Sequence, residues 1–394
     1  MKTLGIHYHI AVKSVDGKLL APGYYSKFID SIATEWDKVL LFAYVPLGEH
    51  EKNLCDTPFE ATNIELKSLG PHYKVYKRFL VNKARSAILS SADEFDSFLF
   101  RLPTPIFVTL PMRFFLDNSV CGYLVGDYME GWKSTIPSTV YRLKHLLLYV
   151  YYSAYSRRQA KRLTVCTSIV TNSAFLQERL QANFKHQVHL VESTTLSNKD
   201  ILKDEQHIKV KGIKRIFFAG RFDPQKGLYE LFKAFEILKQ DVSTDFELHL
   251  AGWFDSDDRE LILAFERMKE GYPNSFFNHG KLKVGSELLE KMDQMDLFII
   301  PSYAEGFPRV IWEAMARGVP VIASNVGAIP FYLRHNVDAL IVEPKSSKDI
   351  VMAVTQLFNN SELYRTIVKN GLLKVKEITL EKKGKQLNKI LLDE

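Results

Sequence analysis

The sequence has few cysteines and no long apolar run. Its three cysteines, Cys55, Cys121 and Cys166, are widely spaced and form no CxxC pair, which excludes a disulfide framework and a cysteine zinc site and favours a reducing compartment. No segment has the roughly 20 apolar residues that span a bilayer. The N-terminal run, residues 1–12, is too short for the apolar core of a signal peptide. We therefore expect a cytoplasmic protein that is soluble or peripheral on the inner face of the membrane.

The sequence also lacks low-complexity tracts, helical repeats and spaced metal ligands. Hydrophobic residues make up 46% and aromatic residues 12% of the 394 residues, so we expect ordered globular structure of two domains. The eleven histidines show no i, i+4 pair beside acidic residues. The string at residues 255–257 matches a DxD metal motif but precedes a predicted helix, so helix capping is the better interpretation. No metal and no cofactor are expected.

Positive charge is concentrated in the first half of the chain. Residues 1–200 carry 24 Lys and Arg against 18 Asp and Glu. Residues 133–162 are basic, rich in tyrosine and free of acidic residues. A helix there has two interpretations: docking on an anionic membrane surface, which is slightly favoured, or a core helix with a solvated basic face. No nucleic-acid-binding module accompanies the segment, so we expect no nucleic-acid partner.

Apolar runs alternate with amphipathic stretches in both halves of the chain. Strand, helix and strand in succession imply parallel sheets with crossover helices, so the fold class is α/β with two doubly wound sheets. The expected organisation is an N-terminal domain at 1–195, a polar linker at 196–212 and a second domain at 213–378. A C-terminal helix at 379–394 can return to the N-terminal domain. Ligands of such sheets bind in the loops after the strands.

Residues 301–324 contain two glutamates around a predicted strand-to-helix turn. Pro308 suits the first helical turn, and the free backbone N–H groups at residues 307–310 offer positive potential for a diphosphate. Glu305 precedes the helix and Glu313 follows about two turns in, so both carboxylates can point along one ligand. Taken singly, Glu305 is better explained as a helix-start carboxylate and Glu313 as an exposed helix residue.

A second polar turn follows the predicted strand at residues 215–220. Arg221 and Lys226 flank this turn, which leads into an amphipathic helix. The sequence has neither a P-loop nor a Gly-rich fingerprint here, so a diphosphate entering this turn needs compensating side-chain charge. Two cations at a strand end are also common in surface loops.

Residues 213–345 resemble the GT4 family of retaining glycosyltransferases in the order and spacing of these motifs. The family signature is two glutamates separated by seven residues, here Glu305 and Glu313. The resemblance implies a GT-B fold, in which two Rossmann-like domains face a central cleft, with the sugar-nucleotide donor in the C-terminal domain. It also implies that Glu305 lies at the donor sugar, that Glu313 holds the ribose, and that Arg221 and Lys226 bind phosphates in place of a metal.

The same resemblance extends the candidate donor site and shows two departures. The loop from Gly280 to Leu282 is implied to approach the nucleotide base. Arg309 replaces an aliphatic residue of the family; its side chain can reach phosphate or cover the surface, and we favour the surface. Near Phe331 the family often has a glutamate, so nothing is assigned there. The candidate donor-binding residues are Arg221, Lys226, Leu282, Gly306, Phe307, Arg309, Val310, Glu313 and Gly23.

The N-terminal half resembles the family only weakly, as expected for a domain that binds the acceptor. Gly23, at a predicted helix start, could let the backbone approach the donor phosphates or could be part of a plain turn. Asp127 ends a predicted strand where many relatives have a histidine facing the acceptor. It could accept a hydrogen bond from the acceptor hydroxyl or cap the next turn, and we name it with Glu305 as a catalytic candidate. Arg101 ends the preceding strand with the same ambiguity.

These motifs predict a retaining, metal-independent transfer of a sugar from a nucleoside diphosphate to an acceptor hydroxyl. A carbohydrate or lipid-linked acceptor of the cell envelope is the family-level expectation. One alternative is a GT-B sugar-nucleotide epimerase or phosphorylase, and another is a catalytically silent GT-B scaffold that binds a partner. A dinucleotide oxidoreductase is disfavoured because neither half opens with GxGxxG between strand and helix.

Overall fold

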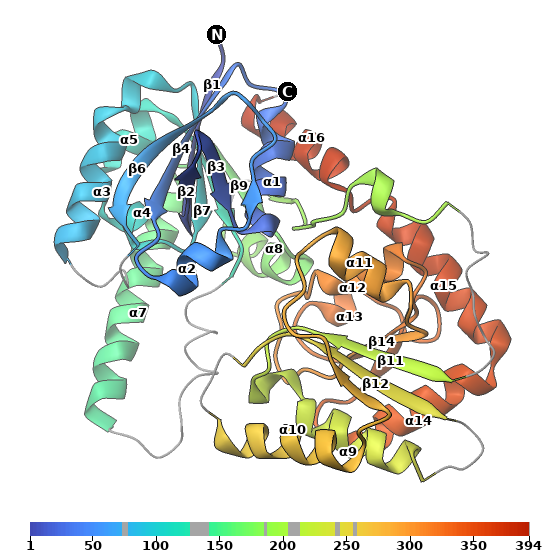
Figure 1. The fold of residues 1–394 in the computed structure, drawn as a ribbon. Coiled ribbons are helices and arrows are strands. Elements are labelled where there is room, and N and C mark those ends of the chain that lie inside the picture. Colours follow the sequence, from blue (N-terminus) through green and yellow to red (C-terminus); the bar gives the residue numbers. More distant parts are fainter. Residues whose placement is uncertain are drawn as a thin grey trace. The chain divides into compact units, whose positions relative to one another are not determined.

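The computed structural model describes residues 1–72, 78–126, 142–184, 187–203, 213–240, 245–254 and 258–393. The chain forms two compact units (Figure 1). The N-terminal unit comprises Met1–Ser193 together with Glu381–Glu394, and the C-terminal unit comprises Thr194–Leu380. Of the predicted linker at 196–212, residues 204–212 lie outside the described ranges.

The N-terminal unit is built on a seven-stranded parallel sheet in the order β10-β9-β8-β7-β1-β4-β6. Its strands are β1 (Thr3–Ala11), β4 (Lys38–Val45), β6 (Ile64–Pro71), β7 (Ser97–Leu102), β8 (Ser119–Leu124), β9 (Ser168–Thr171) and β10 (Val188–Leu190). Its helices are α1 (Gly23–Ala33), α2 (Glu49–Leu54), α3 (Arg78–Ser90), α4 (Pro105–Thr109), α5 (Met112–Asp117), α7 (Arg142–Leu163), α8 (Ala174–Gln181) and α16 (Leu380–Leu391).

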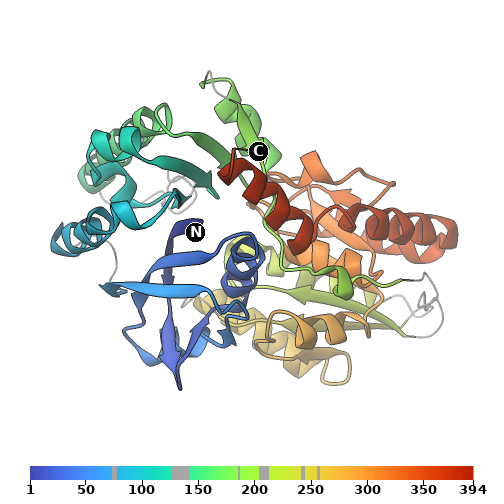
Figure 2. The same cartoon turned by 90° about the horizontal axis from the view of Figure 1, so that it is seen from above.

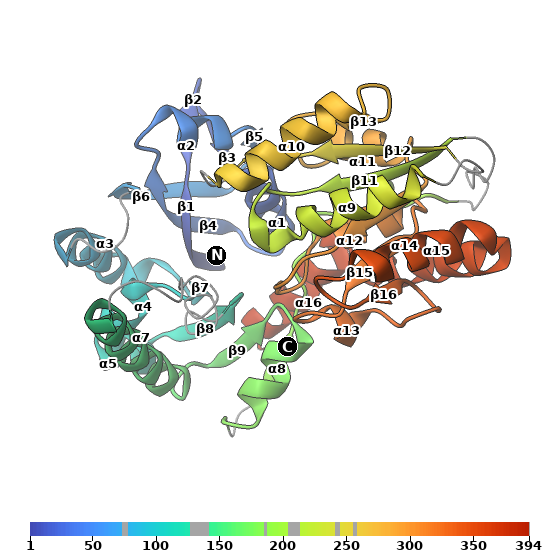
Figure 3. The same cartoon turned by 90° about the horizontal axis from the view of Figure 1, so that it is seen from below.

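Both faces of this sheet are covered by helices. β4 is an almost continuous apolar run whose residues 39–44 are all buried, as expected for a central parallel strand. Helices α3, α4, α5 and α7 lie on one side of the sheet and α1 on the other (Figure 3). The chain builds outward from β1 through β4 to β6, and then returns to place β7 on the other side of β1. The strand order therefore reverses between β1 and β7.

A small antiparallel sheet, absent from the sequence-based predictions, follows β1. It contains β2 (Lys13–Val15), β3 (Lys18–Ala21) and β5 (Thr57–Pro58). Asp16 and Gly17 form the two-residue hairpin turn, and both have positive φ, at 50° and 77°. Asp-Gly is a preferred pair for such a turn because both central residues need positive φ. This hairpin separates β1 from α1, where the sequence had predicted only a loop.

The C-terminal unit contains a six-stranded parallel sheet in the order β13-β12-β11-β14-β15-β16. Its strands are β11 (Lys214–Ala219), β12 (Phe246–Ala251), β13 (Phe276–Asn278), β14 (Leu297–Ile300), β15 (Val321–Ser324) and β16 (Leu340–Val342). Its helices are α9 (Leu228–Leu238), α10 (Arg259–Gly271), α11 (Ser286–Met292), α12 (Val310–Ala316), α13 (Ile329–Tyr332), α14 (Ser347–Asn359) and α15 (Ser361–Val375).

Two apolar cores lie on opposite faces of this second sheet. Alternate residues of β11 point to opposite sides, so Ile216 and Phe218 belong to one core and Phe217 to the other. Helices α9, α10 and α14 cover the first core, and α11, α12 and α13 cover the second (Figure 1). Here the strand order reverses between β11 and β14.

The C-terminal helix α16 packs on the N-terminal unit, beside α1 (Figures 1 and 2). Trp36 donates its indole N–H to the Asn388 side chain at 3.0 Å, and Asn388 donates to the Ile32 carbonyl at 3.0 Å. Gly384 faces the Ser31 carbonyl, where an added Cβ would lie 2.4 Å from the oxygen. Residues from both ends of the chain thus complete one unit. The three cysteines are buried and unbridged.

Candidate functional site

Charged side chains gather at the strand-order reversal of the C-terminal unit. In doubly wound sheets, the loops that leave two adjacent strands in opposite directions form a crevice at the carboxyl ends of those strands. In this unit these loops follow β11 and β14. The loop after β11 carries Arg221 and Lys226, and the loop after β14 carries Glu305. The topology therefore brings together residues that lie about 80 positions apart in the sequence.

Lys226 and Glu305 form an ion pair across this reversal. The Nζ of Lys226 lies 2.5 Å from Oε1 of Glu305, and both side chains are largely buried, at 16% and 11% exposure. The hydroxyl of Ser302, itself fully buried, donates to the same carboxylate oxygen at 2.8 Å. Glu305 is thus held from two sides through one oxygen. The pair compensates two charges that would each be costly to bury alone.

The backbone around this pair is fixed by two glycines. Gly227 follows Lys226 with φ of +68°, and a Cβ there would lie 1.9 Å from the Pro301 carbonyl oxygen. Gly327 has φ of +56°, and its added Cβ would lie 1.7 Å from the Glu305 carbonyl oxygen. No side chain fits at either position, because the conformation favours glycine and the space is filled by backbone. Close backbone contact therefore locks the positions of Lys226 and Glu305.

Glu313 is a buried carboxylate, not the exposed helix residue that it would be if taken singly. It is 6% exposed and lies in the first turn of α12, which begins at Val310 rather than at Pro308. The hydroxyl of Thr195 donates to its Oε1 at 2.5 Å. Glu313 therefore follows the helix start by one turn, not the predicted two. A buried carboxylate with a defined hydroxyl partner has a fixed orientation.

The remaining candidate residues of this unit are less buried than Glu313. Arg221 is half exposed, and its guanidinium lies 3.7 Å from the Asp223 carboxylate. Gly306 is exposed, whereas Leu282 packs against the second core. Arg309 is half-buried at the N-cap of α12.

The expected row of backbone N–H groups at 307–310 is incomplete. Pro308 has no N–H, so the row reduces to Phe307, Arg309 and Val310. The phenyl ring of Phe307 stacks on Trp312 with centroids 4.3 Å apart, within the core. The side chain of Phe307 is therefore structural, and only its backbone remains a candidate for ligand contact.

Tyr303 links the two loops from the other side. Its N–H donates to the Gln225 carbonyl at 2.7 Å, and its hydroxyl donates to the Glu230 carboxylate. Burial and the Glu230 partner raise the pKa of Tyr303 well above its usual range. The Lys345 ammonium lies over the Tyr303 ring at 5.2 Å. The tyrosine stays protonated as a donor and ties the Lys226 loop to the Glu305 loop.

Two candidate residues of the N-terminal unit are Asp127 and Gly23. Asp127, the second catalytic candidate, lies outside the described residues, as do residues 133–141 of the basic segment. Gly23 is buried as the first residue of α1, and its added Cβ would lie 2.7 Å from the Thr57 hydroxyl. Close packing against β5 accounts for this glycine without a ligand. In the C-terminal unit, residues 255–257 also lie outside the described ranges, and Asp258 caps α10.

Sequence reasoning did not find Ser302 and Thr195. Ser302 lies between β14 and Glu305, a position with no distinguishing spacing. Thr195 is 118 residues from its partner Glu313 and lay in the stretch expected to end the first domain. Only the folded chain brings these two hydroxyls to the two carboxylates.

Comparisons with known proteins match the part of the chain that contains these residues. Residues 200–374 match the family model described as glycosyl transferases group 1. The match covers most of the C-terminal unit. An uncharacterized glycosyltransferase of Methanocaldococcus jannaschii is 27% identical over 217 residues, covering 54% of this chain and 56% of that protein. A putative teichuronic acid biosynthesis glycosyltransferase of Bacillus subtilis, TuaC, is 28% identical over 156 residues, covering 39% of this chain and 35% of that protein.

These matches span about half of the first relative and a third of the second. The whole chain is covered by a structural comparison. HepE of Anabaena, solved in complex with UDP, superposes over 100% of both chains with a TM-score of 0.67 at 16% identity. The fold is therefore GT-B, with the group 1 domain as its second Rossmann-like half.

No group of three or more His, Cys, Asp or Glu side chains in the described ranges is arranged to hold a metal ion. Among the helices of those same ranges, none is long and apolar enough to cross a membrane.

Proposed function

We propose that this protein is a retaining, metal-independent glycosyltransferase that moves a sugar from a nucleoside diphosphate to an acceptor hydroxyl. The observation that carries the proposal is the buried Lys226–Glu305 pair at the strand-order reversal of the group 1 domain. A cation and a carboxylate held at the ligand edge of a doubly wound sheet suit a ligand that has both phosphate and hydroxyl groups.

The donor roles follow from the charges at this edge. Lys226, with Arg221, would stabilise the negative charge that develops on the departing diphosphate, the task a metal performs in other transferases. Glu305, released from Lys226 when phosphate enters, would accept hydrogen bonds from the donor sugar. Glu313, oriented by the Thr195 hydroxyl, would accept hydrogen bonds from the ribose hydroxyls.

The chemical step we propose needs no protein nucleophile. The acceptor oxygen forms a bond to the anomeric carbon on the face from which the diphosphate leaves, as the bond from that carbon to the phosphate oxygen breaks. The proton of the acceptor hydroxyl passes to the departing phosphate. The configuration is retained, and catalysis is electrostatic, with Lys226 contributing most where the charge is greatest.

For the acceptor we propose a carbohydrate or lipid-linked sugar of the cell envelope. The name of the Bacillus subtilis relative, for teichuronic acid biosynthesis, supports this class. UDP, which HepE of Anabaena holds, is the first nucleotide to test. The protein would act in the cytoplasm, at the inner face of the membrane.

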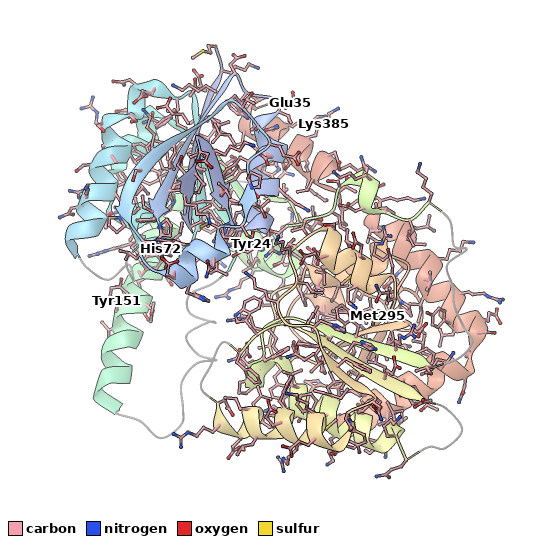
Figure 4. All side chains as sticks on the ribbon, in the orientation of Figure 1. Tyr24, Glu35, His72, Tyr151, Met295 and Lys385 are labelled. Carbon is pink, nitrogen blue, oxygen red and sulfur yellow. The ribbon has the colours of Figure 1, made fainter. Side chains whose placement is uncertain are left out.

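Helix α7 supplies the proposed membrane contact. Val150 and Tyr151 are 56% and 47% exposed on this helix, and Tyr151 is marked in Figure 4. Arg157, Arg158 and Lys161 are also exposed. Interfacial apolar groups beside cations suit an anionic bilayer surface. The protein should float with vesicles rich in phosphatidylglycerol at low salt and not with pure phosphatidylcholine; absence of flotation at low salt would reject the contact.

Product analysis tests the proposed reaction. The protein is incubated with a UDP-, GDP- or ADP-sugar and a panel of acceptors in the presence of EDTA, and the product is examined by proton NMR. Transfer with the anomeric configuration of the donor supports the proposal. Inversion, or dependence on added metal, contradicts the mechanism. Turnover with water or phosphate alone would identify an epimerase, hydrolase or phosphorylase instead, and donor binding without turnover would identify a silent scaffold.

A further inference from the structure

The N-terminal unit has its own strand-order reversal, between β1 and β7, with a cation at its carboxyl edge. Arg101 lies near the end of β7. Its guanidinium carbon is 5.3 Å from the centre of the Tyr8 ring and 5.2 Å from that of Tyr25. Such contacts hold a cation but supply no counter-charge. In the described part of the chain, no carboxylate pairs with Arg101.

Three histidines at the same unit have buried ring nitrogens without partners. His7, in β1, is fully buried, and neither of its ring nitrogens is hydrogen-bonded. The Nδ1 of His9 and the Nε2 of His72 are likewise unpaired and buried. Buried polar atoms normally have partners, so unpaired ones need an explanation. The ring of His7 packs at a tilt against Phe100 within the core, whereas His9 and His72 lie nearer the carboxyl edge of β1.

His9 and His72 form a polar wall beside this edge. Their ring centroids are 4.9 Å apart, and the Nδ1 of His72 is held by the Glu51 carboxylate at 2.7 Å. If Nδ1 of His72 carries the proton for Glu51, its unpaired Nε2 is an acceptor. His72 lies beside α2 and Tyr24 at the start of α1, at the same end of the N-terminal sheet (Figure 4).

The local field at this edge is positive. Burial, then the neighbouring His72 and Arg101, lowers the pKa of His9 to about 4. Burial, then His9, also lowers the pKa of His7 to about 3, and Arg101 contributes. Both rings are therefore neutral near pH 7, and neither adds a positive charge beside Arg101. A half-buried guanidinium with no described counter-ion favours a planar anion, which it can bind through two parallel hydrogen bonds.

We propose that the carboxyl edge of β1 and β7 binds an anionic acceptor, a sugar that carries a carboxylate or a phosphate. Arg101 pairs with the anionic group. This inference rests on the proposed function, because the group 1 domain binds the donor and leaves this unit for the acceptor. It narrows the acceptor from carbohydrates in general to acidic ones.

The test uses the full chain and simple probes. Saturation-transfer NMR measures binding of methyl β-D-glucuronide and of methyl β-D-glucoside, which differ in the carboxylate. The wild type should bind the glucuronide roughly tenfold more tightly than the glucoside, as expected for a charge-assisted pair. Arg101→Gln should lose this preference, and Arg101→Lys should keep part of it. Arg113→Gln, at an 87% exposed surface arginine of α5, should retain it in full.

Each outcome decides the inference. Equal binding of the two probes, or an unchanged preference in a folded Arg101→Gln variant, overturns it. Inorganic phosphate added as a competitor separates the two anions. If phosphate displaces the glucuronide at concentrations below the Kd of the glucuronide, the acceptor is phosphorylated. If displacement needs concentrations above that Kd, the acceptor is a sugar acid. The variant Lys226→Ala should retain the glucuronide preference. If UDP fails to raise the melting temperature while this preference persists, the proposed function fails and the anion site stands.

Discussion

The cation at the C-terminal reversal is paired with a carboxylate, whereas the cation at the N-terminal reversal has no carboxylate partner among the described residues. Lys226 is 2.5 Å from the Glu305 carboxylate, and both side chains are largely buried. Arg101 lies between two tyrosine rings, and in the described ranges no carboxylate pairs with it. Two sheets with the same doubly wound topology therefore differ in whether the cation at the strand-order reversal has a described carboxylate partner.

This difference has a chemical consequence. Under the proposed function, a diphosphate that enters the C-terminal edge would replace Glu305 as the partner of Lys226, so donor binding would exchange one ion pair for another and free a carboxylate for the sugar. By our further inference, an anion that enters the N-terminal edge pairs with Arg101, for which the described ranges show no carboxylate partner. The first edge is thus selective for ligands that satisfy both charges at once, and the second accepts a single anionic group.

The largest expected effect comes from removing the paired cation. Lys226→Ala should lower turnover by roughly 10²–10³-fold, because the diphosphate loses charge stabilisation in the transition state. Steady-state rates of sugar transfer measure the loss. Lys239→Ala is the matched control, since Lys239 caps the far end of α9 and pairs with Asp245 at 2.6 Å. Turnover within twofold of wild type would remove Lys226 from the site.

A backbone change should disturb the same edge without altering its charges. Gly327→Ala places a Cβ against the Glu305 carbonyl at positive φ, so we expect a loss of about 1–3 kcal/mol in the free energy of unfolding and reduced turnover. Gly271→Ala is the control, because nothing lies within 4 Å of its added Cβ. Urea unfolding compares the two. A Gly327→Ala protein as stable as Gly271→Ala would show that the edge is not fixed in this way.

Acid should weaken the N-terminal unit through His7. Burial, then His9, lowers the pKa of His7 to about 3, whereas the unfolded chain titrates near 6.5. The unfolded state therefore takes up the proton first, and stability falls as pH drops below 6.5. Between pH 7 and pH 5 this one histidine should cost about 2 kcal/mol. His7→Leu should lose that much less in urea unfolding at the two pH values; identical losses would contradict the buried, neutral ring.

The smallest effect is expected at the hydroxyl that holds Glu313. Thr195→Val keeps the shape of the side chain and removes the donor to the carboxylate at 2.5 Å. We expect the donor KM to rise about fivefold with kcat nearly unchanged, in line with one lost hydrogen bond. Thr194→Val provides a neighbouring buried threonine as control. Equal KM values for the two variants would exclude a positioning role for Thr195.

The C-terminal unit could be predicted further than the N-terminal unit, for physical reasons. Its strands are short continuous apolar runs, as in β14 and β15, and its loops carry charges at fixed spacing. The strands and the residues of the donor edge could therefore be predicted from the sequence. The hydrogen-bond donors to the two glutamates could not be predicted, because the Ser302 and Thr195 hydroxyls reach Glu305 and Glu313 only through tertiary packing. The start of α12 was also placed two residues early, since Pro308 precedes the helix.

In the N-terminal unit the signals were weaker or were overlooked. The Asp16–Gly17 pair marks a hairpin turn, yet the surrounding sequence was interpreted as a loop. β6 is a half-buried edge strand with little apolar alternation, and it was not predicted. Arg101 was singled out, but its tyrosine neighbours come from β1 and α1, and no local pattern shows them.

The most direct test of the account is donor binding by thermal shift. UDP-, GDP- and ADP-sugars are screened against the wild type, Glu313→Ala and Arg101→Gln, because a ligand that binds the folded state raises the melting temperature. We predict that one nucleotide class stabilises the wild type and Arg101→Gln equally, and that Glu313→Ala loses most of the shift. A shift of equal size in Glu313→Ala, or none with any nucleotide sugar in the wild type, would contradict a donor site in the group 1 domain.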